Sequence, residues 1–467
     1  MITETAVHHL SATELLDLYR RKALSPVEVT KAVLDRIAHW EPSLRASYAL
    51  DPEGALAQAR QAEARWSRGA PAGALDGVPL MIKENIATQG VAVPLGTAAT
   101  ELTPAAADAP PAARLREAGA VFMGKTTMPD LGMLSSGLSS FHPLTRNPWN
   151  LDLNPGGSSA GAGAGAAAGY GPLHLGTDIG GSVRLPAGWC GIFALKPSLG
   201  RIPIDPPYIG RVAGPMTRTV ADAALMMGVL SLPDERDHMS LPPQTIDWRN
   251  LDRDVRGLKL GLLLDAGLGL PVEPEVKAAI EEAARRFKEA GAHIEPMKPF
   301  LTREMLEGLD RFWRTRALAD MSKWSPERRA KVLPFILAWA EGAEGASGMD
   351  VYQGFNQVMV MRAATNAACR PYDYVLAPTA PLPAFAAELP CPTNDPAKPF
   401  EHIVFTVAFN MSEQPAASIN AGYTRSGLPI GLQIIGKRFD DLGVLQVARK
   451  FEELREKQRS WPEPAMA

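Results

Sequence analysis

The pattern of hydrophobic and polar positions predicts two helices near the start of the chain. Ser11 and Ser25 each precede a glutamate by three positions, which is the capping box that begins a helix. Apolar residues then recur on one face, as at Val29, Val33 and Ile37. We expect these two helices to flank the main body of the protein or to cover it as a lid.

Short apolar runs farther along predict strands that alternate with helices. A helix is predicted over residues 276–290, where apolar residues keep helical spacing and Gly291 ends the pattern. The runs expected to be strands are VPLMI at 78–82, AVFMG at 120–124, LKLGLLL at 258–264, AHIEPM at 292–297, DYVLAPT at 373–379 and GLPIGLQIIG at 427–436. This alternation is typical of an α/β layer architecture.

We expect a single domain over residues 1–467, with a central part at about 76–230. The polar or Pro-rich stretches 231–256 and 377–398 lack the low complexity of a flexible tether. Residues from about 300 to 370 predict a mostly helical insertion near the substrate pocket. Its aromatic residues indicate either an apolar pocket or ordinary core packing: Phe312, Trp313, Trp324, Phe335, Trp339, Tyr352 and Phe355. The loop at 201–211 is also expected to lie at the pocket.

Composition excludes several classes of partner. The chain carries 48 Lys and Arg against 51 Asp and Glu, so no net field favours a nucleic acid or an anionic membrane. Its cysteines, Cys190, Cys369 and Cys391, are too few and too scattered for a disulfide framework or a zinc site. We expect a reducing, cytoplasmic location. The first residues lack a basic start and an apolar core, so we expect no secretory signal.

Two glycine-containing motifs match phosphate-binding patterns in the wrong context. GAVFMGKT at 119–126 fits a phosphate loop, yet a helix precedes it and its own start is strand-like. We therefore expect Lys125 to be a solvated strand end. GAGAGAAAG at 161–169 resembles a dinucleotide fingerprint but follows no strand. Its small residues indicate a helix that packs very close to its neighbours.

The chemistry is concentrated in NPGGSSAGAGAGAAAGYGPLHLGTDIGGSVR, residues 154–184. The glycines before Ser182 allow unusual backbone angles and close approach of a substrate. Consecutive backbone N–H groups of Ile179, Gly180, Gly181 and Ser182 can converge on one oxygen, which is what an oxyanion hole requires.

In this block the chain resembles the amidase signature family. The matching stretches are DGVPLMIKENI (76–86), residues 154–184, LPAGWCGIFALKPS (185–198), GPMTRTVADAALMM (214–227), LAPTAPLPAF (376–385) and NMSEQPAASINAGYTRSGLPIGLQIIG (410–436). The resemblance implies a three-layer α/β/α fold with a large, mixed, twisted sheet. It also implies a Ser–cisSer–Lys triad, in which Ser182 is the nucleophile, Ser158 the bridging serine after a cis peptide, and Lys83 the base. Glu84 and Ala160 replace the family's commoner Asp and Gly.

The physical logic agrees with this assignment. A serine hydroxyl must lose its proton as it attacks, and the central block offers no histidine for the task except His174 on a strand-like run. An exposed lysine has a pKa of about 10.4 and is protonated, whereas burial can bring a lysine towards about 7–8. We expect Ser182 to pass its proton through Ser158 to Lys83. An acyl-enzyme on Ser182 then reacts with water.

Four neighbouring residues are expected to support the triad: Ser159, Thr177, Asp178 and Arg184. Other interpretations are open for three groups. Ser159 suits a helix N-cap, Asp178 and Arg184 suit a simple ion pair in the core, and Lys83 suits a salt-bridged strand end.

The expected function is hydrolysis of amide-type C–N bonds in small molecules, including anilides and carbamates, as an amidase or urethanase. We expect no cofactor, no metal, no nucleic-acid or membrane partner, and a monomer or homodimer. One alternative is the glutaminase subunit of a tRNA-dependent amidotransferase. A second is an esterase, because GSSAG at 157–161 fits a nucleophile elbow with Ser159 as nucleophile and His402 as base, although NPGG is a poor strand before it. A third is a non-catalytic binding protein that retains the fold.

Overall fold

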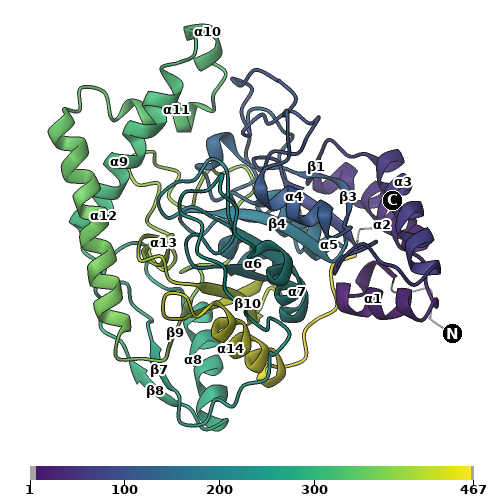
Figure 1. Ribbon diagram of the computed structural model, residues 1–467. Helices are drawn as coiled ribbons and strands as arrows, with labels where there is room; N and C mark the ends of the chain where they lie inside the picture. Colours follow the sequence, from purple (N-terminus) through teal and green to yellow (C-terminus); the bar gives the residue numbers. More distant parts are fainter. Residues whose placement is uncertain (1–6, 464–467) are drawn as a thin grey trace.

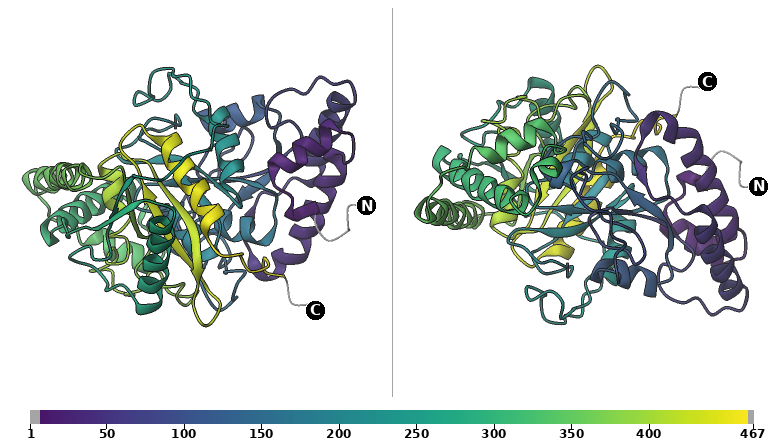
Figure 2. Two further views of the ribbon diagram at one scale, coloured as in Figure 1. Left: turned by 90° about the horizontal axis from the view of Figure 1, so that it is seen from below. Right: turned by 90° about the horizontal axis from the view of Figure 1, so that it is seen from above.

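One mixed β-sheet runs through the computed structural model, which describes residues 7–463 (Figures 1 and 2). Its strand order is β1-β3-β2-β4-β6-β5-β10-β11-β9-β7-β8. The strands are β1 (Ser47–Tyr48), β2 (Pro79–Lys83), β3 (Val121–Thr126), β4 (Leu173–Asp178), β5 (Phe193–Lys196), β6 (Val212–Thr217), β7 (Lys259–Leu262), β8 (His293–Pro296), β9 (Tyr374–Pro378), β10 (Ala416–Tyr423) and β11 (Pro429–Ile435).

Helices connect these strands and cover the sheet. Within the described residues they are η1 (Val7–His9), α1 (Ala12–Arg20), α2 (Pro26–Leu44), α3 (Pro52–Ser67), α4 (Pro110–Glu117), η2 (Asp130–Gly132), α5 (Ala160–Ala168), α6 (Arg184–Cys190), α7 (Val220–Leu230), α8 (Pro274–Glu289), α9 (Arg303–Met321), α10 (Pro326–Arg329), α11 (Pro334–Glu341), α12 (Gly348–Cys369), α13 (Val407–Met411) and α14 (Asp441–Leu454). Each helix is too short or too polar to cross a membrane.

The two faces of the sheet are covered by different helices. In β5, Phe193 and Leu195 point into the core that includes α7, α8 and α14, because alternate side chains of a strand face opposite ways. Ala194 points to the other face, where it packs with Ala162 of α5 and Ala187 of α6. Helices therefore lie on both sides of the sheet, and the predicted three-layer α/β/α fold is confirmed.

Most elements expected from the hydrophobic pattern are present. Both capping boxes form, at Ser11–Glu14 and Ser25–Glu28, and the six predicted strands correspond to β2, β3, β7, β8, β9 and β11. The pattern does not predict β6, whose sequence contains Gly214 and Pro215. Hydrogen bonds with β4 and β5 on its two sides hold this segment extended despite its composition.

The helices at the two ends of the sheet are far apart (Figure 2). Helices α2 and α3 pack beside β2 and β3, so the N-terminal helices flank the sheet and do not form a lid. Helices α9–α12 lie within the predicted insertion, at the opposite end. The first six residues, where we expect no secretory signal, lie outside the described residues. The three cysteines are buried as free thiols.

The small residues at 161–169 form α5, which is buried along its whole length, as expected for a closely packed helix. A Cβ atom on Gly161 would overlap the Ala46 carbonyl oxygen and lie 2.5 Å from the backbone nitrogen of Thr127. Both neighbours are backbone atoms, so they cannot rotate away. The absence of a side chain here lets α5 approach β3 closely.

We predict that Gly161→Ala destabilises the protein by about 1–3 kcal/mol or more, since the methyl group forces backbone shifts. Gly348→Ala is the matched control, because Gly348 is exposed at the start of α12 and has no heavy atom within 4 Å of an added Cβ. That control should be neutral or slightly stabilising. Thermal and denaturant unfolding of both variants measures the difference; equal midpoints would contradict this packing argument.

Candidate active site

The candidate site lies at the carboxyl ends of two neighbouring parallel strands. Lys83 ends β2 and Asp178 ends β4, and parallel strands bring such ends to the same edge of a sheet. The segment before α5 reaches the same edge and carries a cis peptide bond between Gly157 and Ser158. The turn 179–183, which leads into α6, completes the site.

Lys83 is completely buried and contacts two serines. Its Nζ lies 2.8 Å from Ser158 Oγ and 3.0 Å from Ser159 Oγ. Its side chain is 0% exposed, and it forms no ion pair with any residue in 7–463. The interpretation of Lys83 as a salt-bridged strand end is therefore wrong.

Burial is the main reason why the pKa of Lys83 lies well below the ordinary lysine value. The positive charge of Arg211 lowers this pKa further, whereas Asp178 and Glu84 oppose the shift. Glu84 is itself buried and paired with His142. The surroundings of Lys83 thus favour a neutral amine, which can accept a proton.

Ser159 links three parts of the site. Besides Lys83, its hydroxyl lies 3.2 Å from the Thr177 carbonyl oxygen, and its backbone N–H donates to the Ser182 carbonyl oxygen at 3.1 Å. Asn85, which the sequence does not single out, donates to the Thr177 hydroxyl at 3.1 Å. Although Ser159 precedes α5, its side chain makes no capping hydrogen bond, so the N-cap interpretation is wrong.

Ser182 is partly exposed and lies on the wall of a pocket. Its hydroxyl makes no hydrogen bond with another described residue, so the contact from Ser182 to Ser158 that the relay needs is not formed in this structure. The bond from Ser159 N–H to the Ser182 carbonyl holds the two serine segments against each other. Catalytic hydrogen bonds are often long before substrate binds and tighten in the complex.

A buried ion pair holds the turn that carries Ser182. Arg184 contacts Asp178 through two nitrogens, at 3.0 and 2.9 Å, and both side chains are 0% exposed. Asn410 donates to the same carboxylate at 2.8 Å. Arg184 and the other donors hold the pKa of Asp178 well below its usual range despite its burial. Asp178 and Arg184 do form a core ion pair, and that pair also contacts the turn directly.

The backbone N–H groups of the turn divide into two sets. Gly181 N–H donates to Asp178 Oδ1 at 2.8 Å, and Val183 N–H donates to Oδ2 at 3.1 Å. Among the described residues, the N–H groups of Ile179, Gly180 and Ser182 have no acceptor. Gly181 was expected in the oxyanion hole, but its N–H is already used to hold the turn, which corrects that assignment.

The histidine-dependent esterase has no support in this geometry. Both ring nitrogens of His402 are buried without a hydrogen-bond partner in the described chain, and burial lowers its pKa to about 3. The Ser159 hydroxyl is bonded to Lys83 and Thr177 instead. His174, in the middle of β4, is likewise buried, with a pKa of about 3.

Two further lysines are buried. Lys125, expected to be a solvated strand end, is only 2% exposed, and its Nζ contacts the Ile86 carbonyl oxygen and the Thr88 hydroxyl. The prediction failed because the strand itself is interior to the sheet. Lys196 donates to the Pro197 carbonyl oxygen at 2.9 Å. Burial lowers the pKa of both lysines to about 7.

The pocket beside Ser182 is mostly apolar. Its void is about 440 Å³, part of it open to solvent. It is lined by Gly132, Met133, Leu134, Ser135, Ile179, Gly180, Ser182, Trp313, Cys391, Pro399, Phe400 and Ile403. The segments around 132–135 and 391–403 carry no motif recognisable in the sequence, and the loop 201–211 contributes none of these residues.

Most aromatic residues of the insertion are packing residues. Of the seven that the sequence highlights, Trp313 of α9 lines the pocket. Phe312 and Phe355 pack against each other between α9 and α12, with ring centroids 5.4 Å apart. Trp339 is buried in the core, and Tyr352 is exposed. The core interpretation therefore holds for most of the set.

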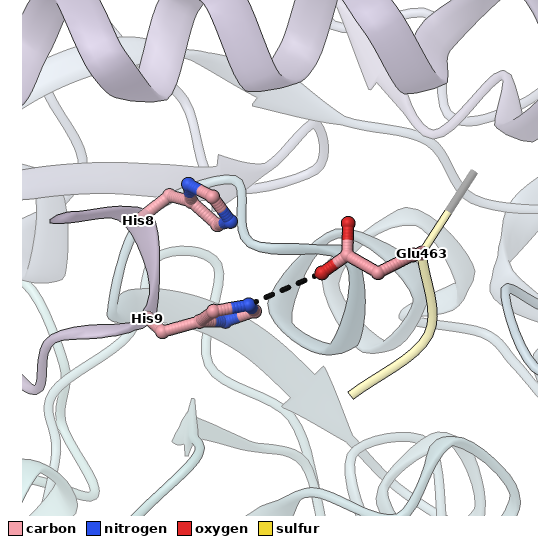
Figure 3. A group of neighbouring side chains, drawn as sticks. All are labelled: His8, His9 and Glu463. Carbon is pink, nitrogen blue, oxygen red and sulfur yellow. Dashed lines mark hydrogen bonds and ion pairs between the residues drawn. The ribbon is translucent and has the colours of Figure 1, made fainter. Parts of the chain in front are cut away.

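His8, His9 and Glu463 form the one cluster of potential metal ligands among residues 7–463 (Figure 3). His9 Nε2 lies 3.2 Å from Glu463, and its Nδ1 lies 3.0 Å from the Arg218 guanidinium. The arginine can only donate, so His9 Nδ1 accepts and Nε2 carries the hydrogen that faces Glu463. Arg36 also pairs with Glu463. Two neighbouring guanidinium groups disfavour a cation, and the cluster instead connects η1 to the C-terminal segment.

Comparison with known proteins identifies the family. The Amidase family model matches residues 28–445. A glutamyl-tRNA(Gln) amidotransferase subunit of Myxococcus xanthus (strain DK1622) is 35% identical over 463 residues, which cover 92% of this chain and 93% of that protein. The structure of a bacterial aryl acylamidase of the amidase signature family superposes with a TM-score of 0.89 at 32% identity, covering 96% of each chain.

A peptide amidase from Stenotrophomonas maltophilia has the same fold, with a TM-score of 0.83 at 26% identity, covering 97% of this chain and 98% of that one. The resemblance seen in the glycine–serine block is thus confirmed over nearly the whole chain. The protein belongs to the amidase signature family and is a hydrolase that acts on C–N bonds.

Proposed function

We propose that this protein hydrolyses amide bonds of small molecules through an acyl-enzyme on Ser182, with Ser158 and Lys83 as its proton-transfer partners. The observation that carries the proposal is the buried Lys83 amine 2.8 Å from Ser158 Oγ, without a carboxylate partner in the described chain. A neutral amine in this position can receive the proton that a serine nucleophile must lose.

The hydrogen bonds around Lys83 orient its lone pair. The Ser159 hydroxyl hydrogen points to the Thr177 carbonyl oxygen, because a carbonyl can only accept. Ser159 Oγ therefore accepts an N–H from Lys83, at 3.0 Å. The lone pair of the neutral amine is then free to accept the hydroxyl hydrogen of Ser158. Ser159 is thus a positioning residue in this proposal.

The reaction proceeds in two balanced halves. Ser182 Oγ bonds to the substrate carbonyl carbon as its proton passes to Ser158, whose own proton passes to Lys83. When the C–N bond breaks, Lys83 returns a proton through Ser158 to the leaving nitrogen. Water then attacks the ester on Ser182 by the same route, and the acid is released. The unpaired N–H groups of Ile179, Gly180 and Ser182 are suited to stabilise the oxyanion, where one donor contributes a factor of about 10²–10³ in rate.

The apolar pocket lining favours an aryl or acyl group next to the reacting bond. Trp313, Phe400 and Ile403 offer apolar and aromatic surface. An anilide or a carbamate with such a group fits this lining. A panel of anilides, carbamates and primary amides would identify the preferred class, and hydrolysis of none of them would contradict the proposal of a stand-alone amidase.

A second candidate is the glutaminase component of an amidotransferase. It is favoured by relatives that are glutamyl-tRNA(Gln) amidotransferase subunits, including the 35% identical protein from Myxococcus xanthus. Glutamine hydrolysis uses the same acyl-enzyme chemistry. Glutaminase activity that appears only after a tRNA-binding partner protein is added would favour this candidate, whereas anilide hydrolysis by the chain alone would favour the first.

We predict that an active-site serine reagent such as a fluorophosphonate labels the wild-type protein and Ser159→Ala but not Ser182→Ala. Ser182 faces the pocket, whereas Ser159 is fully buried. Intact-mass spectrometry measures the adduct. Labelling of Ser182→Ala together with loss of labelling in Ser159→Ala would reverse the assignment of the nucleophile.

We predict that kcat/KM rises with pH along an acid limb set by Lys83 and levels off well below the ordinary lysine pKa of 10.5, because only the neutral amine accepts the proton. Protonation below the pKa of Lys83 lowers the rate about tenfold per pH unit. Lys83→Met should lower kcat/KM by about 10²–10⁴ or more. Lys277→Met, at an exposed position of α8, is the control. A rate that still rises at pH 10.5 would show that Lys83 is an ordinary lysine.

We predict that Arg184→Met destabilises the protein by about 3–5 kcal/mol, because it leaves the buried Asp178 carboxylate without its counter-charge. The same variant should lose activity as the turn loosens. Arg285→Met removes an exposed ion pair on α8 and should leave the stability almost unchanged. Unfolding midpoints and kcat/KM of both variants provide the comparison; a similar stability for the two would mean that the buried pair is not needed.

A further inference from the structure

The loop at 201–211 ends beside the candidate oxyanion hole. In the antiparallel ladder of β4 and β6, Asp178 pairs with Val212. One step further along both chains, Arg211 lies opposite Ile179. Arg211 N–H donates to the Tyr208 carbonyl oxygen at 3.0 Å, so both residues belong to one turn. The effect of Arg211 on the pKa of Lys83 agrees with this proximity.

A second arginine approaches the same turn from α9. Trp313 of this helix covers the turn after β4, since a Cβ on Gly180 would lie 3.3 Å from its ring. Arg316 follows three residues later, on the same side of the helix. Its guanidinium carbon lies 4.5 Å from the centroid of the Tyr208 ring. Tyr208, Arg211 and Arg316 therefore gather at the edge of the site.

The charges of this group are not neutralised within residues 7–463. Neither Arg211 nor Arg316 has a carboxylate oxygen within ion-pair distance, although Asp205 is near enough to raise the pKa of Arg211. One Arg211 nitrogen donates to the Pro206 carbonyl oxygen at 3.1 Å, which leaves its other N–H groups unused. The Tyr208 hydroxyl is buried without a hydrogen-bond partner among the same residues.

Burial and the charge of Arg316 lower the pKa of Arg211 to about 10, which reflects the repulsion between the two half-buried cations. Folding alone gives no reason to place two guanidinium groups and an unsatisfied hydroxyl together. Two planar forks and one hydroxyl donor are suited to a carboxylate, which accepts two hydrogen bonds from each arginine in parallel.

We propose that Tyr208, Arg211 and Arg316 form a specificity site for a carboxylate carried by the substrate, close to the bond that is cleaved. This inference rests on the proposed amide hydrolysis and narrows its substrate class. The apolar pocket then holds an aryl or acyl group, while the arginines hold the carboxylate at the opposite side of the turn 179–183. The substrate is a compact amide acid, with its charge on either the acyl or the amine part.

The test compares substrates that differ only in charge. 4-Acetamidobenzoate carries the carboxylate on the amine part, and succinic acid monoanilide carries it on the acyl part; the methyl ester of each is the neutral partner. In the wild-type protein, kcat/KM for one of the two acids should exceed that for its ester. Arg211→Gln and Arg316→Gln should each lower kcat/KM for that acid about 10- to 100-fold and change the rate with the ester less than about threefold. Arg311→Gln, on the exposed face of α9, is the matched control.

Binding is measured separately in Ser182→Ala protein, by isothermal titration with the same two acids. Weakened binding of an acid in Arg211→Gln and Arg316→Gln would support the carboxylate site even if no substrate were turned over, which would contradict only the proposed hydrolysis. Hydrolysis of the esters without any preference for either acid would overturn the carboxylate site and leave the hydrolase intact. Equal binding of both acids by wild-type and variant proteins would also overturn it. Melting curves of the variants check that each is folded.

Discussion

The chemistry of this protein depends on holding one amine uncharged inside the fold. Lys83 is buried at the end of a central strand and has serine hydroxyls as its only side-chain neighbours among the described hydrogen bonds. A carboxylate in contact would restore the charge and remove the base. The nearest acids are therefore committed elsewhere: Asp178 to Arg184 and the turn, and Glu84 to His142.

The arrangement separates chemistry from selectivity. The reacting groups come from β2, the start of α5 and the turn after β4, which all belong to the centre of the sheet. The pocket wall comes mainly from the segments around residues 132–135, α9 and residues 391–403. Changes in these outer segments can alter the accepted acyl or aryl group without moving the amine or the serines. This division agrees with the range of amidases that share the fold.

Local sequence patterns were informative where the chemistry is local. The strand that ends at Lys83, the two capping boxes and the glycine-rich helix are each encoded within a short stretch of the chain. The pocket wall was not predictable, because it joins segments far apart in the chain. The burial of Lys125 was missed because the surroundings of a strand are set by its neighbours in the sheet. The use of Gly181 N–H by Asp178 depends on the angles of a turn, which a glycine alone does not specify.

The three interior lysines make the fold a proton acceptor when it opens. In the unfolded chain each amine binds a proton below about pH 10.5, whereas in the folded protein Lys125 and Lys196 do so only below about pH 7. Between these values the unfolded state holds more protons, so the free energy of unfolding increases as the pH rises. The same interior that supplies a base for catalysis thereby makes the molecule sturdier in mildly alkaline than in neutral solution, as far as these amines are concerned.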